Sequence, residues 1–173
     1  YLAVYHFIRQ QYGFLKLYSR NESQNKILKL FDKIAIYTAT LYSLIFWHLS
    51  SARNFNWFVD GDFLTFRNDL LLRLSGIAYL LIISLYLIKE LMQIIKLKWI
   101  NIPRNLIVLG TFLSWYFGIV YFNGDMAFTT LNVISHGIPY MALIWFFEKQ
   151  KMEKGATKND FLKHCFGQYG ILF

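Results

Sequence analysis

The sequence has one cysteine, Cys165, and only two prolines among its 173 residues, and charged side chains make up just 16% of it. A single cysteine excludes a disulfide framework. Soluble domains carry about 25% charged residues, and disordered chains are poorer in apolar residues than this one. The hydrophobic share of 56% and the aromatic share of 20% are instead high. This composition indicates that much of the chain lies in lipid rather than in water.

Several apolar runs approach or reach the length that a transmembrane helix needs, about 20 residues for ~30 Å of hydrocarbon. Residues 106–122 carry no charge, and residues 74–95 carry only Lys89 and Glu90, near their end, where a long side chain can extend toward the lipid headgroups. The sequence therefore predicts an all-α, polytopic transmembrane bundle that forms a single domain over residues 1–173. Its expected spans are about 1–18, 34–50, 74–95, 106–122 and 126–147, which makes four full spans and part of a fifth.

The distribution of basic residues between these runs gives an independent indication of topology. Residues 15–33 contain five Lys or Arg, residues 96–104 contain three, and residues 148–164 contain five, whereas residues 51–71 contain two and residues 123–125 none. Basic loops lie on the cytoplasmic side of membranes. We therefore expect 15–33, 96–104 and 148–164 in the cytoplasm. Because the chain begins at Tyr1 and ends in the apolar run 169–173, we also expect a fragment of a longer protein.

The formal net charge of +8 is explained by these loops, since the cytoplasmic leaflet is anionic. A nucleic-acid partner is not expected, because no basic stretch alternates with exposed aromatics on a soluble face. The expected partners are the lipid bilayer, a hydrophobic small molecule and other subunits of a larger membrane complex. Four tryptophans lie near the ends of the expected spans and are typical of an interfacial aromatic belt: Trp57, Trp99, Trp115 and Trp145.

Polar residues inside apolar spans are candidates for a functional site, because they are costly to hold in lipid. His136 lies about midway along residues 126–147. Asn132 precedes it by four residues and Tyr140 follows it by four, so all three project from one helix face. The spacing predicts that this face points into the bundle.

Two further histidines lie in expected spans. His6 is roughly ten residues before Lys16, which at 1.5 Å per residue places it about 15 Å into the bilayer. Gln10 lies four residues further along the same face. This depth matches that of His136, so His6 and His136 are expected to approach each other near the midplane. His48 is the fifteenth residue of the run 34–50 and lies nearer its outer end.

Histidines on separate helices are suitable ligands for iron, copper or zinc, because neutral imidazole is the commonest protein ligand for these metals. The sequence thus gives His6, His48 and His136 as candidate metal ligands. Gln10, Asn132 and Tyr140 are candidates for the outer shell that orients the rings. No HxxxH, HxxHH or HExxH occurs, so the familiar membrane desaturases, hydroxylases and zinc proteases are not indicated.

Isolated histidines on several spans, without a histidine box, resemble the Brp/Blh family of multi-pass membrane β-carotene dioxygenases. The segments that carry this resemblance are YHFIRQQYG with His6, FWHLS with His48 and ISHGIPY with His136. The resemblance implies a transmembrane helical fold, iron bound by histidines from different helices, and a polyene substrate. A fourth ligand is missing from these segments unless His164 supplies it.

The sequence analysis thus favours a multi-pass membrane protein that acts as a histidine–iron oxygenase on a lipid or isoprenoid substrate. The alternative is a transporter or a structural subunit of a membrane complex with no catalytic site. A transporter would be indicated by paired broken helices, and Pro139 beside Gly137 is a single break. The residues indicate no particular catalytic group, reaction or oligomeric state.

Overall fold

The computed structural model describes residues 2–22, 25–50, 53–54 and 63–155, and every regular element within these ranges is helical. This confirms the predicted all-α class. Contacts divide the chain into two compact units, residues 1–135 and 136–173, and each is described by itself. The elements are α1 (Leu2–Tyr18), α2 (Lys26–Leu49), α3 (Asp69–Leu97), α4 (Ile102–Trp115), the π-helical η1 (Tyr116–Tyr121), α5 (Asp125–Asn132), the π-helical η2 (Val133–Gly137) and α6 (Ile138–Glu153).

Asparagine side chains determine where three of the long helices begin. Asn25, Asn68 and Asn101 precede α2, α3 and α4, and the side-chain oxygen of each accepts a hydrogen bond from a backbone N–H of the first turn. Asparagine is among the best residues for this capping position. At the other end of α3, Lys98 adopts a left-handed conformation with φ of 50° and ends the helix. The helix boundaries are therefore explained by local sequence.

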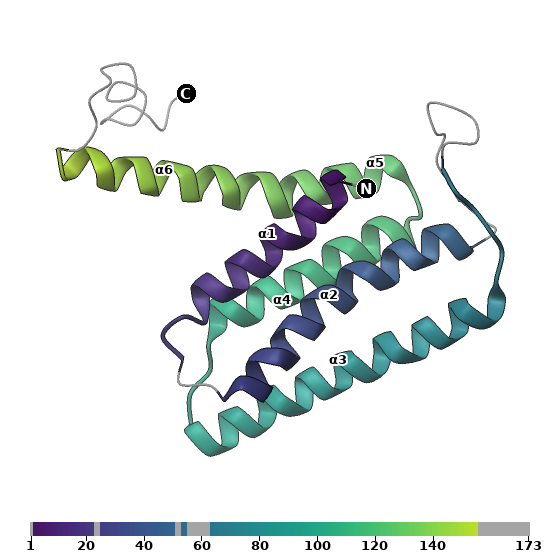
Figure 1. The fold of residues 1–173 in the computed structure, drawn as a ribbon, viewed down its shortest axis with the longest axis horizontal. Coiled ribbons are helices and arrows are strands. Elements are labelled where there is room, and N and C mark those ends of the chain that lie inside the picture. Colours follow the sequence, from purple (N-terminus) through teal and green to yellow (C-terminus); the bar gives the residue numbers. More distant parts are fainter. Residues whose placement is uncertain (1, 23–24, 51–52, 55–62, 156–173) are drawn as a thin grey trace. The chain divides into compact units, whose positions relative to one another are not determined.

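Helix α2 is the central element of the first unit, and it contacts α1, α3, α4 and η1 (Figure 1). One of its faces carries Ala35, Ala39 and Ser43, which are each 0% exposed. Small residues at four-residue spacing let neighbouring backbones approach closely, as in packed membrane helices. Helix α3 packs closely on α2 and meets α4 through side chains such as Tyr79 and Phe112, while α1 contacts both α2 and α4.

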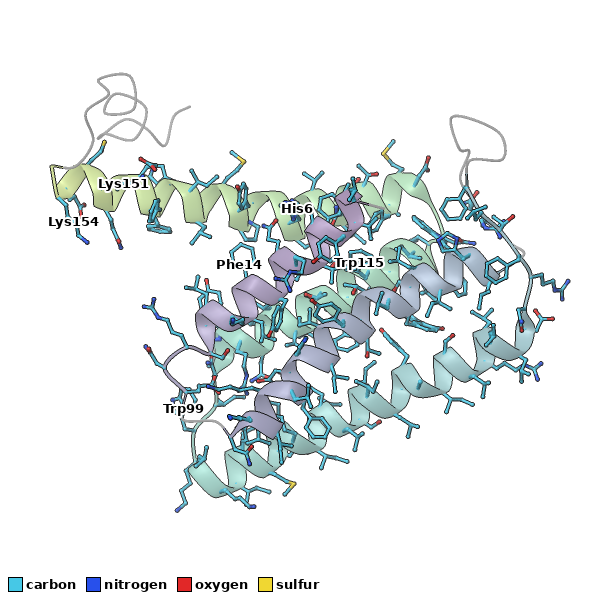
Figure 2. All side chains as sticks on the ribbon, in the orientation of Figure 1. His6, Phe14, Trp99, Trp115, Lys151 and Lys154 are labelled. Atoms are coloured by element: carbon cyan, nitrogen blue, oxygen red, sulfur yellow. The ribbon has the colours of Figure 1, made fainter. Side chains whose placement is uncertain are left out.

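Two clusters of buried side chains fill this unit. One joins Leu15, Ile36, Tyr79, Val108 and Phe112 with their neighbours, and the other is built on Ile8, Trp47, Trp115 and Ile119. Trp115 is only 1% exposed and lies among the helices, whereas Trp99 is 55% exposed in the turn after α3 (Figure 2). The prediction that Trp115 belongs to an interfacial belt is therefore wrong, because the indole packs edge-on against Phe128 inside the unit.

Two helical runs are long and apolar enough to cross a membrane: Asp69–Leu97 and Asp125–Glu153, each of 29 residues. They contain the predicted spans 74–95 and 126–147. Helices α1, α2 and α4 with η1 overlap the predicted spans 1–18, 34–50 and 106–122, and within the described residues they are not long and apolar enough to count as candidate spans. The structure thus bears out two candidate spans, and the larger number stays a prediction.

The described part of the second unit is the single helix α6 with the end of η2 before it. Basic side chains near its C-terminal end lie over aromatic rings: Lys149 over Trp145 at 4.9 Å and Lys151 over Phe147 at 4.6 Å. Lys151 also donates to Glu148 at 2.8 Å. At a membrane interface, the methylene groups of a lysine side chain typically cover apolar surface while its ammonium group stays in water.

Candidate functional site

Five charged side chains from four segments meet inside the first unit, and we call them the charge cluster. Lys89 and Glu90 come from α3, Asp32 from α2, Arg104 from α4, and Glu22 from the turn after α1. None of these side chains is more than 8% exposed. Burying each ion costs several kcal/mol unless it is well paired. The pairing within the cluster therefore decides whether these helices can pack.

Arg104 is the central member of the charge cluster. Its Nη1 lies 2.5 Å from an oxygen of Glu22, and its Nη2 lies 2.5 Å from both oxygens of Glu90. The planar guanidinium suits such a shared arrangement of carboxylates. Asn101 fixes the surrounding backbone, because its amide donates to the carbonyl of Tyr18 at 2.8 Å and its oxygen caps α4. Arg104 thus joins α3 and α4 to the turn that follows α1.

Lys89 holds the other side of the cluster. Its ammonium donates to Glu90 at 2.7 Å and to one oxygen of Asp32. The second oxygen of Asp32 lies 3.8 Å from Arg104, too far for a hydrogen bond. Burial raises the pKa of Asp32, which lies outside the predicted span 34–50, and the charges of Lys89 and Arg104 oppose this rise.

The cluster carries an excess of negative charge when all its members are ionised. Three carboxylates, Glu22, Asp32 and Glu90, face two cations, Lys89 and Arg104, so the sum is one negative charge. An unbalanced buried charge favours either a proton on one carboxyl or a further positive group nearby. The stability of the cluster therefore depends on the protonation of its carboxyl groups, and the cluster also joins the helices that carry its members.

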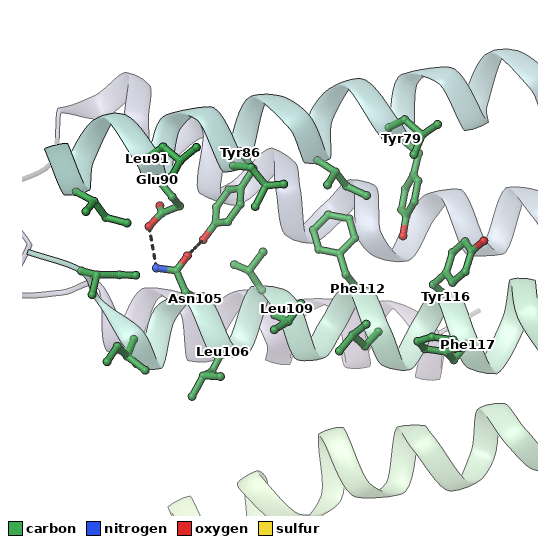
Figure 3. A pocket seen from close by; sticks show the side chains of 18 residues that line it. Tyr79, Tyr86, Glu90, Leu91, Asn105, Leu106, Leu109, Phe112, Tyr116 and Phe117 are labelled. Carbon is green, nitrogen blue, oxygen red and sulfur yellow. Dashed lines mark hydrogen bonds between the residues drawn. The ribbon is translucent and has the colours of Figure 1, made fainter.

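A long apolar groove runs between α3 and α4 and ends at the cluster (Figure 3). Its volume is about 740 Å³, within the usual range for ligand pockets. At its polar end, Tyr86 donates to the side-chain oxygen of Asn105 at 2.8 Å, and the Asn105 amide donates to Glu90 at 2.7 Å. Apolar side chains such as Leu109 and Phe112 line the rest. This shape suits a molecule with a long apolar body and one polar end.

No sequence pattern predicts this centre. The prediction that Lys89 or Glu90 extends to the lipid headgroups is wrong, because each residue is only 6% exposed and its partners lie inside the unit. Arg104, one of the basic residues of the stretch 96–104, lies in the first turn of α4 and is 2% exposed. The available signal was a pair of adjacent opposite charges within an apolar run, followed by Asn101 and Asn105 at the start of the next one.

His48 is the predicted ligand whose surroundings are best defined. It lines a second apolar pocket of about 670 Å³ between the end of α2 and the start of α3. Its Nδ1 lies 2.6 Å from the carbonyl oxygen of Leu64, and its ring stacks on Phe63 with centroids 4.7 Å apart. A carbonyl partner of this kind fixes the tautomer and orientation of metal-binding histidines. The ring is thus oriented, whatever its role.

The other predicted site residues are divided between the two units: His6, Gln10 and Asn132 lie in the first, and His136 and Tyr140 lie in the second. His6 is an exposed residue of α1 (Figure 2), with the ring of Phe7 at 6.1 Å, and Gln10 lies half-buried one turn later. Asn132 is buried in α5, while His136 stacks on Tyr140 in the second unit at 6.3 Å. His6 and His136 belong to different units, so their predicted approach stays a prediction.

A buried amide next to Gln10 was also missed. Gln11 is 4% exposed, and its Nε2 donates to the carbonyl of Ser135 at 3.1 Å. Its oxygen accepts from the hydroxyl of Thr111 at 3.4 Å. Gln11 therefore ties α1 to α4 and to the residue that ends the first unit. The sequence alone does not show that Gln11 makes these contacts, because they depend on how α1 packs.

Within the described ranges, no group of three or more His, Cys, Asp or Glu side chains is arranged so that it could hold a metal ion. His164 and Cys165 lie outside those ranges. No known protein family matches the chain, and no curated protein or solved structure is significantly similar to it.

Proposed function

We propose that this protein is a multi-pass integral membrane protein, and one observation carries the proposal. Helix α3 has 29 residues, yet only 11% of its most apolar window is buried inside the structure, and for the run Asp125–Glu153 the share is 0%. An apolar helix at the core of a soluble protein would be covered by its neighbours. Exposed faces of this length and composition need lipid as their solvent.

The remaining helices of the first unit support a larger number of spans. The other helices also expose apolar side chains, for example Leu41 and Ile45 on α2 and Leu109 and Leu113 on α4, all 37% exposed or more. We propose spans in α1, α2, α3, α4 with η1, and the α5–α6 run. The basic residues of 15–33, 96–104 and 148–164 then lie in the cytoplasm, as the positive-inside rule requires.

Membrane extraction and cysteine labelling test this proposal. In a Cys165→Ser background, Arg67→Cys and Lys98→Cys place a single thiol before and after α3. We expect a membrane-impermeant maleimide to label position 67 from outside intact cells and position 98 only after lysis. We also expect the protein to remain in membranes at alkaline pH. Release by alkali would disprove the membrane proposal, and labelling of both positions from one side would disprove the span.

The second candidate function is that of a membrane-embedded histidine–iron oxidoreductase acting on a lipid or isoprenoid substrate, as the resemblance to carotenoid dioxygenases implies. The observation in its favour is His48, which lies in an apolar pocket with its Nδ1 on a backbone carbonyl. His6 and His136 would supply the other ligands. The bound iron would activate oxygen, while the apolar pocket would hold the substrate.

Metal analysis separates this candidate from a transporter or structural subunit. We expect the gently purified full-length chain to contain iron, copper or zinc in at least about 0.2 equivalents, and His48→Gln to lower that content, because an imidazole ligand is lost. Lys154→Gln, at an exposed position outside the candidate ligands, is the control and should leave the metal content unchanged. A metal-free wild-type protein, or a metal content that His48→Gln does not lower, would remove the enzyme candidate.

A further inference from the structure

A small pocket opens between the end of α1 and the start of α2, and we call it the basic pocket. Its volume is about 190 Å³, and its charged lining consists of Lys16, Arg20 and Lys29 with Asp32 beside them. The three basic residues are exposed, whereas Asp32 is 1% exposed and already bonded to Lys89. The pocket therefore has a rim of positive charge above a buried carboxylate.

The rim cations form no ion pair with an acidic residue of the described chain. Tyr12, which also lines the pocket, has the ammonium groups of Lys16 and Lys33 at 5.9 and 6.0 Å from its ring, and Arg9 lies at 5.9 Å. Cations gathered in this way repel one another and create a strong local positive potential. An anion in the pocket would relieve that repulsion.

A phosphodiester matches the pocket in charge and in hydrogen-bonding groups. Lys16, Arg20 and Lys29 contribute three positive charges at the rim, and the charge cluster beneath them, to which Asp32 belongs, sums to one negative charge. The pocket therefore attracts an anion. A phosphodiester carries a single negative charge, and its two free oxygens accept hydrogen bonds from lysine and arginine.

We propose that the basic pocket binds the phosphodiester of an anionic phospholipid headgroup. The choice of a lipid as the source rests on the proposed membrane function. In that topology the end of α1 and the start of α2 lie at the cytoplasmic surface, where anionic lipids gather. The small volume admits a headgroup while the acyl chains stay in the bilayer.

The test measures lipid binding to the full chain in detergent by native mass spectrometry, with short-chain phosphatidylglycerol as the probe. We expect one lipid bound per chain. A triple variant with Lys16→Gln, Arg20→Gln and Lys29→Gln should bind it on the order of 100-fold more weakly, because each cation near the headgroup contributes about 1 kcal/mol. The control carries Lys26→Gln, Lys96→Gln and Lys154→Gln, which remove the same charge away from the pocket, and it should bind as the wild type does.

A competition experiment distinguishes a phosphodiester that belongs to a membrane lipid from one that belongs to a soluble molecule. Soluble glycerophosphoglycerol, which is the headgroup without acyl chains, should fail to displace the lipid at equal concentration, and inorganic phosphate should also fail. Displacement by the soluble diester would overturn the lipid as the source, and equal weakening in the control variant would overturn the pocket. A wild-type chain that resists alkaline extraction yet binds no lipid would overturn this inference alone. Extraction by alkali would instead count against the membrane function itself.

Discussion

Replacing Arg104 with methionine is expected to lower the free energy of unfolding by about 3–5 kcal/mol, the cost of removing one partner from a buried ion pair. The variant keeps most of the side-chain volume but leaves Glu22 and Glu90 without the guanidinium that joins them. Three carboxylates would then face Lys89 alone. The loss should appear as a lower midpoint of thermal or chemical unfolding in detergent.

Two further variants separate charge from geometry. Arg104→Lys retains the positive charge but cannot reach both carboxylates as the planar guanidinium does, so we expect an intermediate loss. Arg67→Met is the matched control, because Arg67 pairs with Asp69 at 3.1 Å on the surface, where both side chains are more than 60% exposed. Surface pairs contribute little. Equal unfolding midpoints for Arg104→Met and Arg67→Met would show that the charge cluster does not hold the helices together.

Gly118→Ala is expected to destabilise the protein by about 1–3 kcal/mol, as overpacking of a well-packed interior does. A methyl group at Gly118 in η1 would lie 2.9 Å from the Cα of Phe128, so the backbone of α5 would have to move. Phe128 also packs edge-on against Trp47 and Trp115, at 5.4 and 5.2 Å between ring centroids. Displacing it disturbs this whole cluster, and indole fluorescence should report the change together with a lower unfolding midpoint.

The matched control for this variant is Gly110→Ala in α4, the helix that precedes η1. Apart from its own helix's backbone and its chain neighbours, no atom lies within 4 Å of the position that a methyl group at Gly110 would occupy. Since alanine favours the helix over glycine by roughly 0.5–1 kcal/mol, we expect this change to be neutral or slightly stabilising. If both variants lose the same stability, helix propensity rather than close approach governs these positions, and the contact between η1 and α5 is unimportant.

The helices themselves could be predicted from the sequence because their signals are local. Apolar runs of sufficient length predicted α3 and the run from α5 to α6, and the structure has helices over both. The helices begin before the predicted spans, because Asn25, Asn68 and Asn101 cap α2, α3 and α4. His48, a polar residue of the predicted span 34–50, lies in α2, and its Nδ1 is 2.6 Å from the carbonyl oxygen of Leu64.

The charge cluster could not be predicted because pairing is a property of the tertiary structure. Asp32 and Arg104 lie in stretches that are rich in lysine, where a charge usually faces solvent. Only the packing of α2 against α3 and α4 brings them to Lys89 and Glu90. For the same reason, the contacts of Gln11, which follows the predicted Gln10, could not be predicted: its amide joins α1 to Thr111 and Ser135.

The spacing of the charge cluster along the chain bears on how the protein is made. Chains are synthesised from the N-terminus, so Glu22, Asp32, Lys89 and Glu90 all leave the ribosome before Arg104. Until α4 arrives, three carboxylates have a single lysine, and a nascent chain in that state cannot close the packing of α2 and α3 without an unpaired buried charge. We therefore expect the packing of α2 and α3 to become stable only after Arg104 has been synthesised, and chains truncated before it to remain loosely packed.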